Sequence, residues 1–143
     1  MVGTLNYLAP EMIKFNCATM GTDIWALGCI IFKMLTGNVP FAGTSTYMVF
    51  PKIVNKDLEY PESLSVEAVA LIDSMLMLNP NERLGAKDSP HGIEGLKKHP
   101  FFSGIDFSNP KSLCISEELR NYIEGDKVRV PDLMPRKSIF SLD

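Results

Sequence analysis

Histidine and cysteine are the side chains that most often bind metals or act as nucleophiles, and this sequence has few of them. His91 and His99 lie at no metal-ligand spacing from a cysteine or a carboxylate cluster, so they predict neither a metal site nor a catalytic base. Cys17, Cys29 and Cys114 are far apart and odd in number, so they cannot all pair within one chain. This pattern favours a reducing compartment.

A hydroxyl, a carboxylate and a guanidinium stand in a more specific setting, because each belongs to a short motif. The motifs follow in the order Gly3-Thr4-x-x-Tyr7-x-Ala9-Pro10-Glu11, Asp23-x-Trp25-x-Leu27-Gly28, Gly37-x-x-Pro40-Phe41, Asn79-Pro80-x-x-Arg83-Leu84-Gly85 and His99-Pro100-Phe101-Phe102. In this order they resemble the motifs of protein kinases, whose activation segment ends in Ala-Pro-Glu. The last two resemble the AGC group of Ser/Thr kinases, and the DIWALGCIIF run resembles the phosphoinositide-dependent subfamily. The resemblance covers residues 1–102.

Glu11 and Arg83 match two kinase residues that form a buried, bidentate ion pair between the activation segment and the lower lobe. A planar guanidinium suits a carboxylate better than a lysine would, because its two parallel N–H groups face the two oxygens. Two unrelated surface charges would be the ordinary interpretation, and the surrounding motifs favour the pair. If the pair is buried, removing either partner costs about 3–5 kcal/mol, since the other charge is stranded.

Asp23 and Trp25 have simpler explanations beside those that the resemblance implies. Asp23 is suited to capping a helix N-terminus, and the resemblance implies that it also accepts hydrogen bonds from the backbone of the catalytic loop. Trp25 is expected in the core, and the resemblance adds that it shields the Glu11–Arg83 pair.

Thr4 is the residue that the resemblance places nearest to the reaction. Taken alone it is a turn or cap hydroxyl. The matching threonine of Ser/Thr kinases bonds the catalytic aspartate and lysine and marks specificity for Ser/Thr over Tyr. Met1, Gly3 and Leu8 match the pocket for the substrate residue that follows the phosphoacceptor, and their apolar lining predicts an apolar residue there.

The motifs that bind ATP in kinases do not occur in these 143 residues. Phosphoryl transfer requires a glycine-rich loop, a strand lysine, a catalytic-loop aspartate and an Asp-Phe-Gly aspartate that holds magnesium. No two glycines are separated by a single residue, neither histidine begins His-Arg-Asp, and Asp106-Phe107 is followed by Ser108. We expect ATP and magnesium, cofactors of the full-length family, not to bind this chain, because the missing motifs belong upstream of Met1.

Two functions follow from this pattern. We expect a fragment of an active Ser/Thr kinase that phosphorylates proteins, which the resemblance extends to activation loops of other kinases. The alternative is a catalytically inactive, kinase-derived binding module or a truncated gene product. Protein substrates are the expected partners. An open reading frame with His-Arg-Asp and Asp-Phe-Gly upstream of the first codon favours the fragment, and a stop codon or transcription start there favours the module.

Hydrophobic patterning predicts a mainly α-helical chain, which the resemblance identifies as a partial kinase C-lobe. Residues 22–35 are apolar on every side except Lys33, so we expect a helix buried all round, capped by Thr22 or Asp23 and ended by Gly37. The isolated chain would then be marginally stable or prone to aggregation, because part of the cover of this helix belongs to the missing half.

Four further helices are expected along the chain. The stretch 47–54 contains Pro51, which makes its helix short or kinked. Ser65 caps a strong helical pattern that breaks at Asn79-Pro80, while 93–98 and 116–123 are shorter candidates. We divide the chain into a partial kinase domain, residues 1–102, and an extended C-terminal tail, residues 103–143.

Composition limits the possible partners and compartments. The chain is 45% apolar and 22% charged, with a net charge of −3 and a mean hydropathy of +0.05. It therefore lacks the basic footprint typical of nucleic-acid or anionic-membrane binding. There is no secretory-signal pattern, and the longest apolar run, 24–32, is far short of the roughly 20 residues that span a bilayer. We expect a soluble protein of the cytosol or nucleus.

Overall fold

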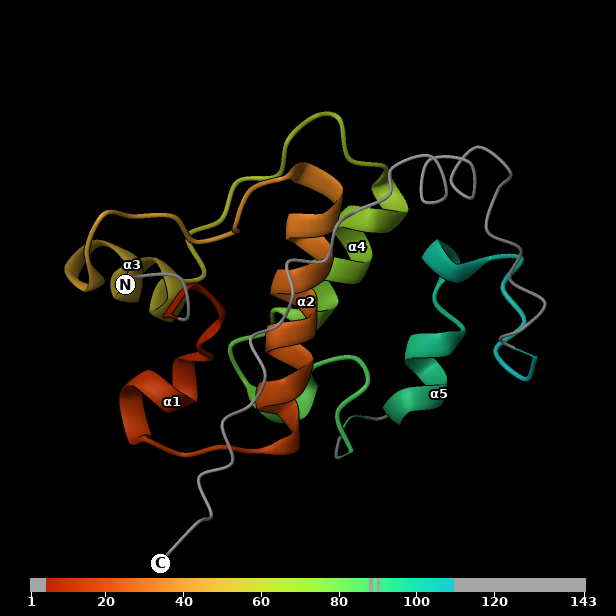
Figure 1. Cartoon of the computed structure of the whole chain (residues 1–143). Coiled ribbons are helices and arrows are strands. Elements are labelled where there is room, and N and C mark those ends of the chain that lie inside the picture. The colour runs from red at the N-terminus through yellow and green to blue at the C-terminus, as the bar shows by residue number, and fades with distance from the viewer. Residues whose placement is uncertain (1–4, 88, 90, 110–143) are drawn as a thin grey trace, which may run out of the picture. The chain divides into compact units, whose positions relative to one another are not determined.

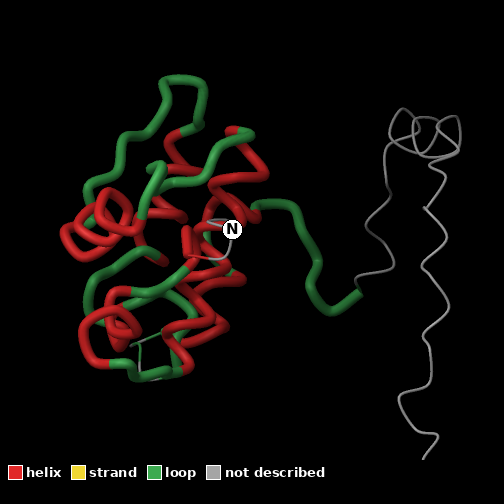
Figure 2. Tube along the Cα trace, turned by 60° about the vertical axis from the view of Figure 1, so that its left-hand side comes forward, coloured by secondary structure: helices red, strands yellow, loops and turns green. Residues whose placement is uncertain are grey.

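The computed structural model describes residues 5–87, 89 and 91–109, and the helices lie in one compact unit that ends at Gly104. The described part of the chain contains helices and loops and no strand (Figure 2), which confirms the mainly helical prediction. No helix within it has the length and hydropathy of a membrane span. In chain order the elements are η1 (Leu5–Tyr7), α1 (Pro10–Phe15), α2 (Met20–Thr36), α3 (Thr46–Asn55), α4 (Val66–Met75), η2 (Pro80–Glu82), α5 (Gly92–Lys97) and η3 (Pro100–Phe102), where η denotes a 3-10 helix.

Helix α2 starts two residues earlier than the sequence indicated. Its N-cap is Thr19, whose backbone N–H donates to Oγ1 of Thr22 at 2.9 Å, one half of a capping box. The predicted caps Thr22 and Asp23 are wrong, because both lie inside the first helical turns. Gly37 ends the helix as expected, with a left-handed φ of 76° that glycine adopts without strain.

Helix α2 packs directly on α4 at the centre of the unit, with α1 and α3 on one side and α5 on the other (Figure 1). Gly28 allows this approach, because a Cβ at that position would lie 3.0 Å from Leu76 Cδ2 and 3.1 Å from Met75 Cβ. The main core gathers around α2 and consists of Ala9, Trp25, Cys29, Phe32, Phe41, Val49, Ile53, Ile72 and Leu76.

One face of α2 is exposed, so the prediction of a helix buried all round is wrong. Leu27, Ile30 and Met34, which we call the α2 stripe, are 39%, 44% and 79% exposed. They follow at spacings of three and four residues, so they line one side of the helix. No element within the described residues covers that side, and apolar side chains there remain in contact with solvent.

The remaining helices match the sequence pattern with changes at their ends. Helix α3 passes through Pro51, which removes one backbone donor without ending the helix. Ser65 caps α4 by accepting a hydrogen bond from the Ala68 backbone N–H at 3.2 Å. Helix α4 ends at Met75, before the predicted break at Asn79-Pro80.

Two predictions concern the C-terminal residues. The candidate helix 116–123 lies outside the described residues. The division into residues 1–102 and a tail, 103–143, stays a prediction.

Candidate functional site

The site is built around Glu11 and Arg83, which the structure brings together from distant parts of the chain. Glu11 lies in the first turn of α1, which Pro10 opens at the first helical position. Arg83 directly follows η2, a short turn opened by Pro80 and capped by the Asn79 side chain, which accepts from the Asn81 backbone N–H. Both side chains therefore leave backbone that local sequence signals hold in place.

Arg83 and Glu11 form a bidentate ion pair inside the protein. Arg83 Nη1 donates to Glu11 Oε1 and Arg83 Nη2 donates to Glu11 Oε2, both at 2.7 Å. Arg83 is 0% exposed and Glu11 is 6% exposed. The parallel N–H groups facing both oxygens are the strong geometry for a guanidinium and a carboxylate.

The remaining donors of Arg83 are also satisfied. Nε donates to the Met77 carbonyl at 2.8 Å, Nη1 to the Gly21 carbonyl at 2.7 Å, and Nη2 to the Leu78 carbonyl at 3.4 Å. Together with the bonds to Glu11, these contacts use the five N–H groups that a guanidinium carries. Arg83 thus joins α1, the start of α2 and the loop after α4.

Trp25 covers this ion pair on one side. Its ring is 0% exposed and its centroid lies 5.0 Å from Arg83 Cζ, within cation–π distance. The Trp25 ring also stacks with Phe41, with centroids 5.6 Å apart and planes at 7°. The indole keeps water from the guanidinium, and it continues into the core through Phe41.

The surroundings of Glu11 keep it ionised. Burial acts most strongly on the Glu11 carboxyl and raises its pKa, but the hydrogen bonds from Arg83 and Thr22 and the charge of Arg83 outweigh burial. The pKa of Glu11 therefore lies below its ordinary value. The Thr22 hydroxyl donates to Glu11 Oε1 at 2.9 Å.

Gly21 and Thr22 also belong to this site, although the sequence had pointed to Thr22 only as a helix cap and not to Gly21 at all. Gly21 brings α2 against η2, since a Cβ there would lie 2.6 Å from the Pro80 carbonyl oxygen. Both precede Asp23 in the sequence, and their signal was a glycine and a hydroxyl residue just before a capping candidate. Their role depends on Glu11 and Pro80, which no local pattern connects to them.

The other predicted site residues lie apart from the ion pair. Asp23 is exposed on α2, with no hydrogen-bond or ion-pair partner for its carboxylate among the described residues. Leu8 follows η1 and is half-buried. Met1, Gly3 and Thr4 lie outside the described residues, so their roles stay predictions.

No cluster of metal ligands accompanies the ion pair: within the described ranges, no group of three or more histidine, cysteine, aspartate or glutamate residues is arranged to hold a metal ion. The Glu11 carboxylate is engaged with Arg83 and Thr22. The arrangement can hold the chain segment before α1 in a fixed position on α2.

Comparisons with known proteins agree with the motif order. The family model described as the protein kinase domain matches residues 1–102. A probable serine/threonine-protein kinase, pdkA, of Dictyostelium discoideum is 39% identical over 76% of this chain and 16% of its own length. The 3-phosphoinositide-dependent protein kinase 1 of Arabidopsis thaliana is 41% identical over 78% of this chain and 22% of its own length.

Another relative extends the comparison to mammals. The 3-phosphoinositide-dependent protein kinase 1 of Rattus norvegicus is 37% identical over 76% of this chain and 19% of its own length. The chain therefore spans about a fifth of the length of these relatives. With the family model over residues 1–102 and these relatives, the chain belongs to the protein kinase domain family and resembles its phosphoinositide-dependent Ser/Thr kinases.

Proposed function

We propose that this chain is the lower part of the C-lobe of a Ser/Thr protein kinase and that it positions the protein substrate. In this role it holds the end of the activation segment and does not handle the nucleotide. The observation that carries the proposal is the buried pair of Glu11 and Arg83, in which Glu11 closely follows the segment that contains Leu8. The phosphorylation of serine and threonine residues in proteins, including activation loops of other kinases, belongs to the polypeptide that also supplies the nucleotide-binding motifs.

The segment before α1 is held by contacts on both sides of Leu8. Glu11 fixes the start of α1, and Tyr7 is attached to α2 through the Lys33 Nζ, which donates to the Tyr7 hydroxyl at 3.3 Å. Ala9, between them, is 0% exposed in the core around Trp25. Leu8 lies between Tyr7 and Ala9, and in this proposal it contacts the substrate, whose orientation requires a fixed position.

In this proposal ATP binding belongs to the longer kinase, because these residues lack the motifs for it. The 143 residues contain no glycine-rich loop and neither the His-Arg-Asp nor the Asp-Phe-Gly motif. ATP and magnesium are thus cofactors of the longer kinase in this proposal, and Thr4 and Asp23 would contact the catalytic loop of that kinase. The protein would act in the cytosol or the nucleus.

The experiment compares this chain with the complete polypeptide that its transcript encodes. We expect the complete polypeptide to phosphorylate serine and threonine peptides but not tyrosine peptides. We expect the 143-residue chain to give no heat of Mg-ATP binding at micromolar concentrations in calorimetry. Glu11→Gln in the complete polypeptide should lower kcat/KM for a protein substrate at least about tenfold, since the segment loses its anchor, with the KM for ATP unchanged.

Two outcomes would contradict the proposal. Micromolar Mg-ATP binding by the 143-residue chain would show that it contains a nucleotide site. A transcript that encodes only these residues would favour the inactive binding module, which lacks phosphoryl transfer but keeps the same anchored segment.

A further inference from the structure

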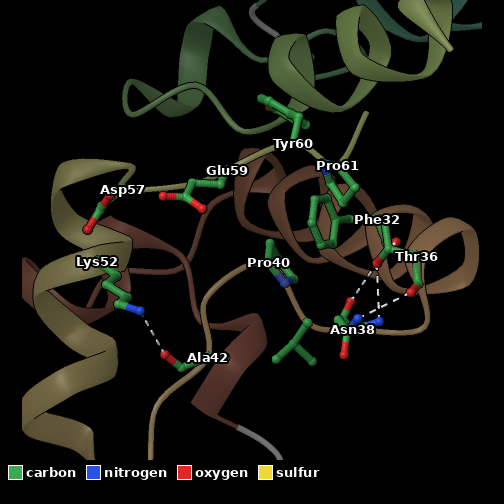
Figure 3. A pocket seen from close by; sticks show the side chains of 11 residues that line it. Phe32, Thr36, Asn38, Pro40, Ala42, Lys52, Asp57, Glu59, Tyr60 and Pro61 are labelled. Carbon is green, nitrogen blue, oxygen red and sulfur yellow. Dashed lines mark hydrogen bonds between the residues drawn. The ribbon is translucent and has the colours of Figure 1, made fainter. Parts of the chain in front are cut away.

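A pocket with a volume of about 420 Å³ lies beside the C-terminal end of α2, away from the ion pair (Figure 3). It is formed by the last turn of α2, the loop that follows α2, and the segment that follows α3. Its apolar wall consists of Phe32, Val39, Pro40, Ala42, Tyr60 and Pro61. Nothing in the proposed kinase function uses this pocket.

The aromatic part of the wall is held in position. The Phe32 and Tyr60 rings lie 6.3 Å apart between centroids, with planes at 57°. The Tyr60 hydroxyl donates to Asp73 Oδ1 at 3.1 Å, and Lys56 Nζ pairs with the same oxygen at 2.8 Å. The wall is therefore preformed, and ordering it on binding would cost little.

The polar groups of the pocket differ in whether they are already engaged. Lys52 Nζ donates to the Ala42 carbonyl at 3.1 Å, and the Thr36 hydroxyl donates to the Phe32 carbonyl at 2.8 Å. The carboxylates of Asp57 and Glu59 have neither a hydrogen-bond nor an ion-pair partner among the described residues. In the view of Figure 3, Asp57 and Glu59 lie on one side of the pocket, with the Phe32 ring across from them.

We propose that this pocket binds an arginine side chain presented by a protein partner. Because Phe32 and Pro40 are themselves buried, the methylene stem would lie on the exposed Pro61. The planar guanidinium would stack beside the half-buried Tyr60 ring and donate to Glu59 and Asp57. Arginine combines an apolar stem, a stacking plane and several donors in one side chain, so it fits both the wall and the free carboxylates. With Lys52 as the one opposing charge in the lining, the pocket keeps a net charge of −1, which complements a cation.

The proposal is independent of phosphoryl transfer, because it concerns a surface that the isolated chain already carries. It can therefore fail while the kinase assignment stands, and the reverse also holds. A single exposed cation site has modest affinity, so we expect a dissociation constant in the millimolar range for a short peptide.

The test uses the full 143-residue chain, labelled with ¹⁵N, and three acetylated, amidated pentapeptides. The first is Ala-Leu-Arg-Leu-Ala, the second has citrulline in place of arginine, and the third has phenylalanine there. Citrulline keeps the shape of the side chain and removes its charge. We expect the arginine peptide to shift the backbone amides of residues 38 and 57–60, and the citrulline and phenylalanine peptides to bind at least about fivefold more weakly.

Variants assign the effect to the two carboxylates. Asp57→Asn combined with Glu59→Gln should weaken the arginine peptide at least about tenfold without changing the amide shifts elsewhere, since both side chains are exposed. Glu62→Gln is the matched control, because Glu62 is an exposed carboxylate of the same segment outside the pocket lining, and it should leave binding unchanged.

Three results would overturn the proposal. Equal binding of the arginine and citrulline peptides would show that charge plays no part. Tighter binding of the phenylalanine peptide would make the pocket an apolar site. Amide shifts that lie outside the pocket, or none up to 20-fold peptide excess, would remove the site altogether.

Discussion

The two faces of α2 carry similar side chains and have opposite surroundings. Trp25, Cys29 and Phe32 on one face are 0%, 0% and 3% exposed. Leu27, Ile30 and Met34, the α2 stripe, lie on the other face and are 39%, 44% and 79% exposed. The difference teaches that the hydrophobicity of a helix position predicts burial only where another element is available to cover it.

Two glycines allow other elements to pack closely on the covered face of α2. Gly28 lets α4 approach, and Gly21 lets η2 approach closely enough for the Gly21 carbonyl to accept from Arg83. Within the described part of the chain, no element packs on the α2 stripe in this way. Four predictions test this contrast, and the most destabilising change comes first.

Arg83→Met should have the largest effect, since it removes the charge that compensates Glu11. The stranded carboxylate costs about 3–5 kcal/mol, and each carbonyl left without a donor adds about 1–3 kcal/mol. The sum approaches the whole stability of a small domain. We expect the cooperative transition in urea, followed by circular dichroism, to disappear.

The double variant Glu11→Leu/Arg83→Met is its control. An apolar pair leaves no stranded charge, so part of the lost stability should return. A single Arg83→Met variant that loses less than about 1 kcal/mol would contradict the burial of the pair.

Phe32→Ala tests the covered face directly, and Met34→Ala tests the α2 stripe on the same helix. Phe32 is 3% exposed, so its truncation should lower the free energy of unfolding by about 3–5 kcal/mol through lost burial and the cavity left behind. Met34 is 79% exposed, and its truncation should stay within about 0.5 kcal/mol. Urea titrations compare the two, and equal losses would refute the contrast.

Acid should weaken the covered face through Glu11. Its folded pKa lies below the ordinary value of 4.5, so its contribution to stability is complete above pH 4.5 and is lost as the pH falls through the folded value. Urea midpoints measured between pH 7 and pH 3 should therefore fall below pH 4.5.

A matched carboxylate separates this effect from the general titration of acidic residues. Glu94 is exposed and pairs with Lys97 on α5. Glu94→Gln should keep the acid dependence, while the double variant Glu11→Leu/Arg83→Met, which removes the pair without stranding a charge, should flatten it. A profile that is unchanged in that double variant would assign the acid sensitivity to other groups.

The smallest effect on stability, and the clearest effect on solubility, is expected at the α2 stripe. Changing Leu27, Ile30 and Met34 together to glutamine should shift the free energy of unfolding by less than about 0.5 kcal/mol per site. Because exposed apolar patches promote association, the unchanged chain should self-associate in sedimentation velocity and the triple variant should not. A monomeric wild-type chain at high concentration would contradict this.

Much of the helical fold could be predicted from the sequence, because its signals are local. Ser65 capped α4, Gly37 ended α2 and the spacing of apolar residues placed α5 to within one residue. The sequence placed the start of α2 two residues too late. By residue type alone, Thr22 and Asp23 are as suitable for the N-cap as Thr19 is. Thr19 took that position, with Thr22 bonding both its backbone and Glu11.

The sequence by itself determined the family and the two partners of the buried ion pair, Glu11 and Arg83. Ordered motifs name residue types at fixed spacing, and a carboxylate and a guanidinium within such motifs suit each other without reference to coordinates. Only the tertiary structure decided that one face of α2 is exposed to solvent and that Thr22 donates a hydrogen bond to Glu11. It also decided that two carboxylates without a partner among the described residues line a pocket with an aromatic wall. These properties depend on contacts between different segments of the chain, such as that of Thr22 with Glu11, so local pattern carries no information about them.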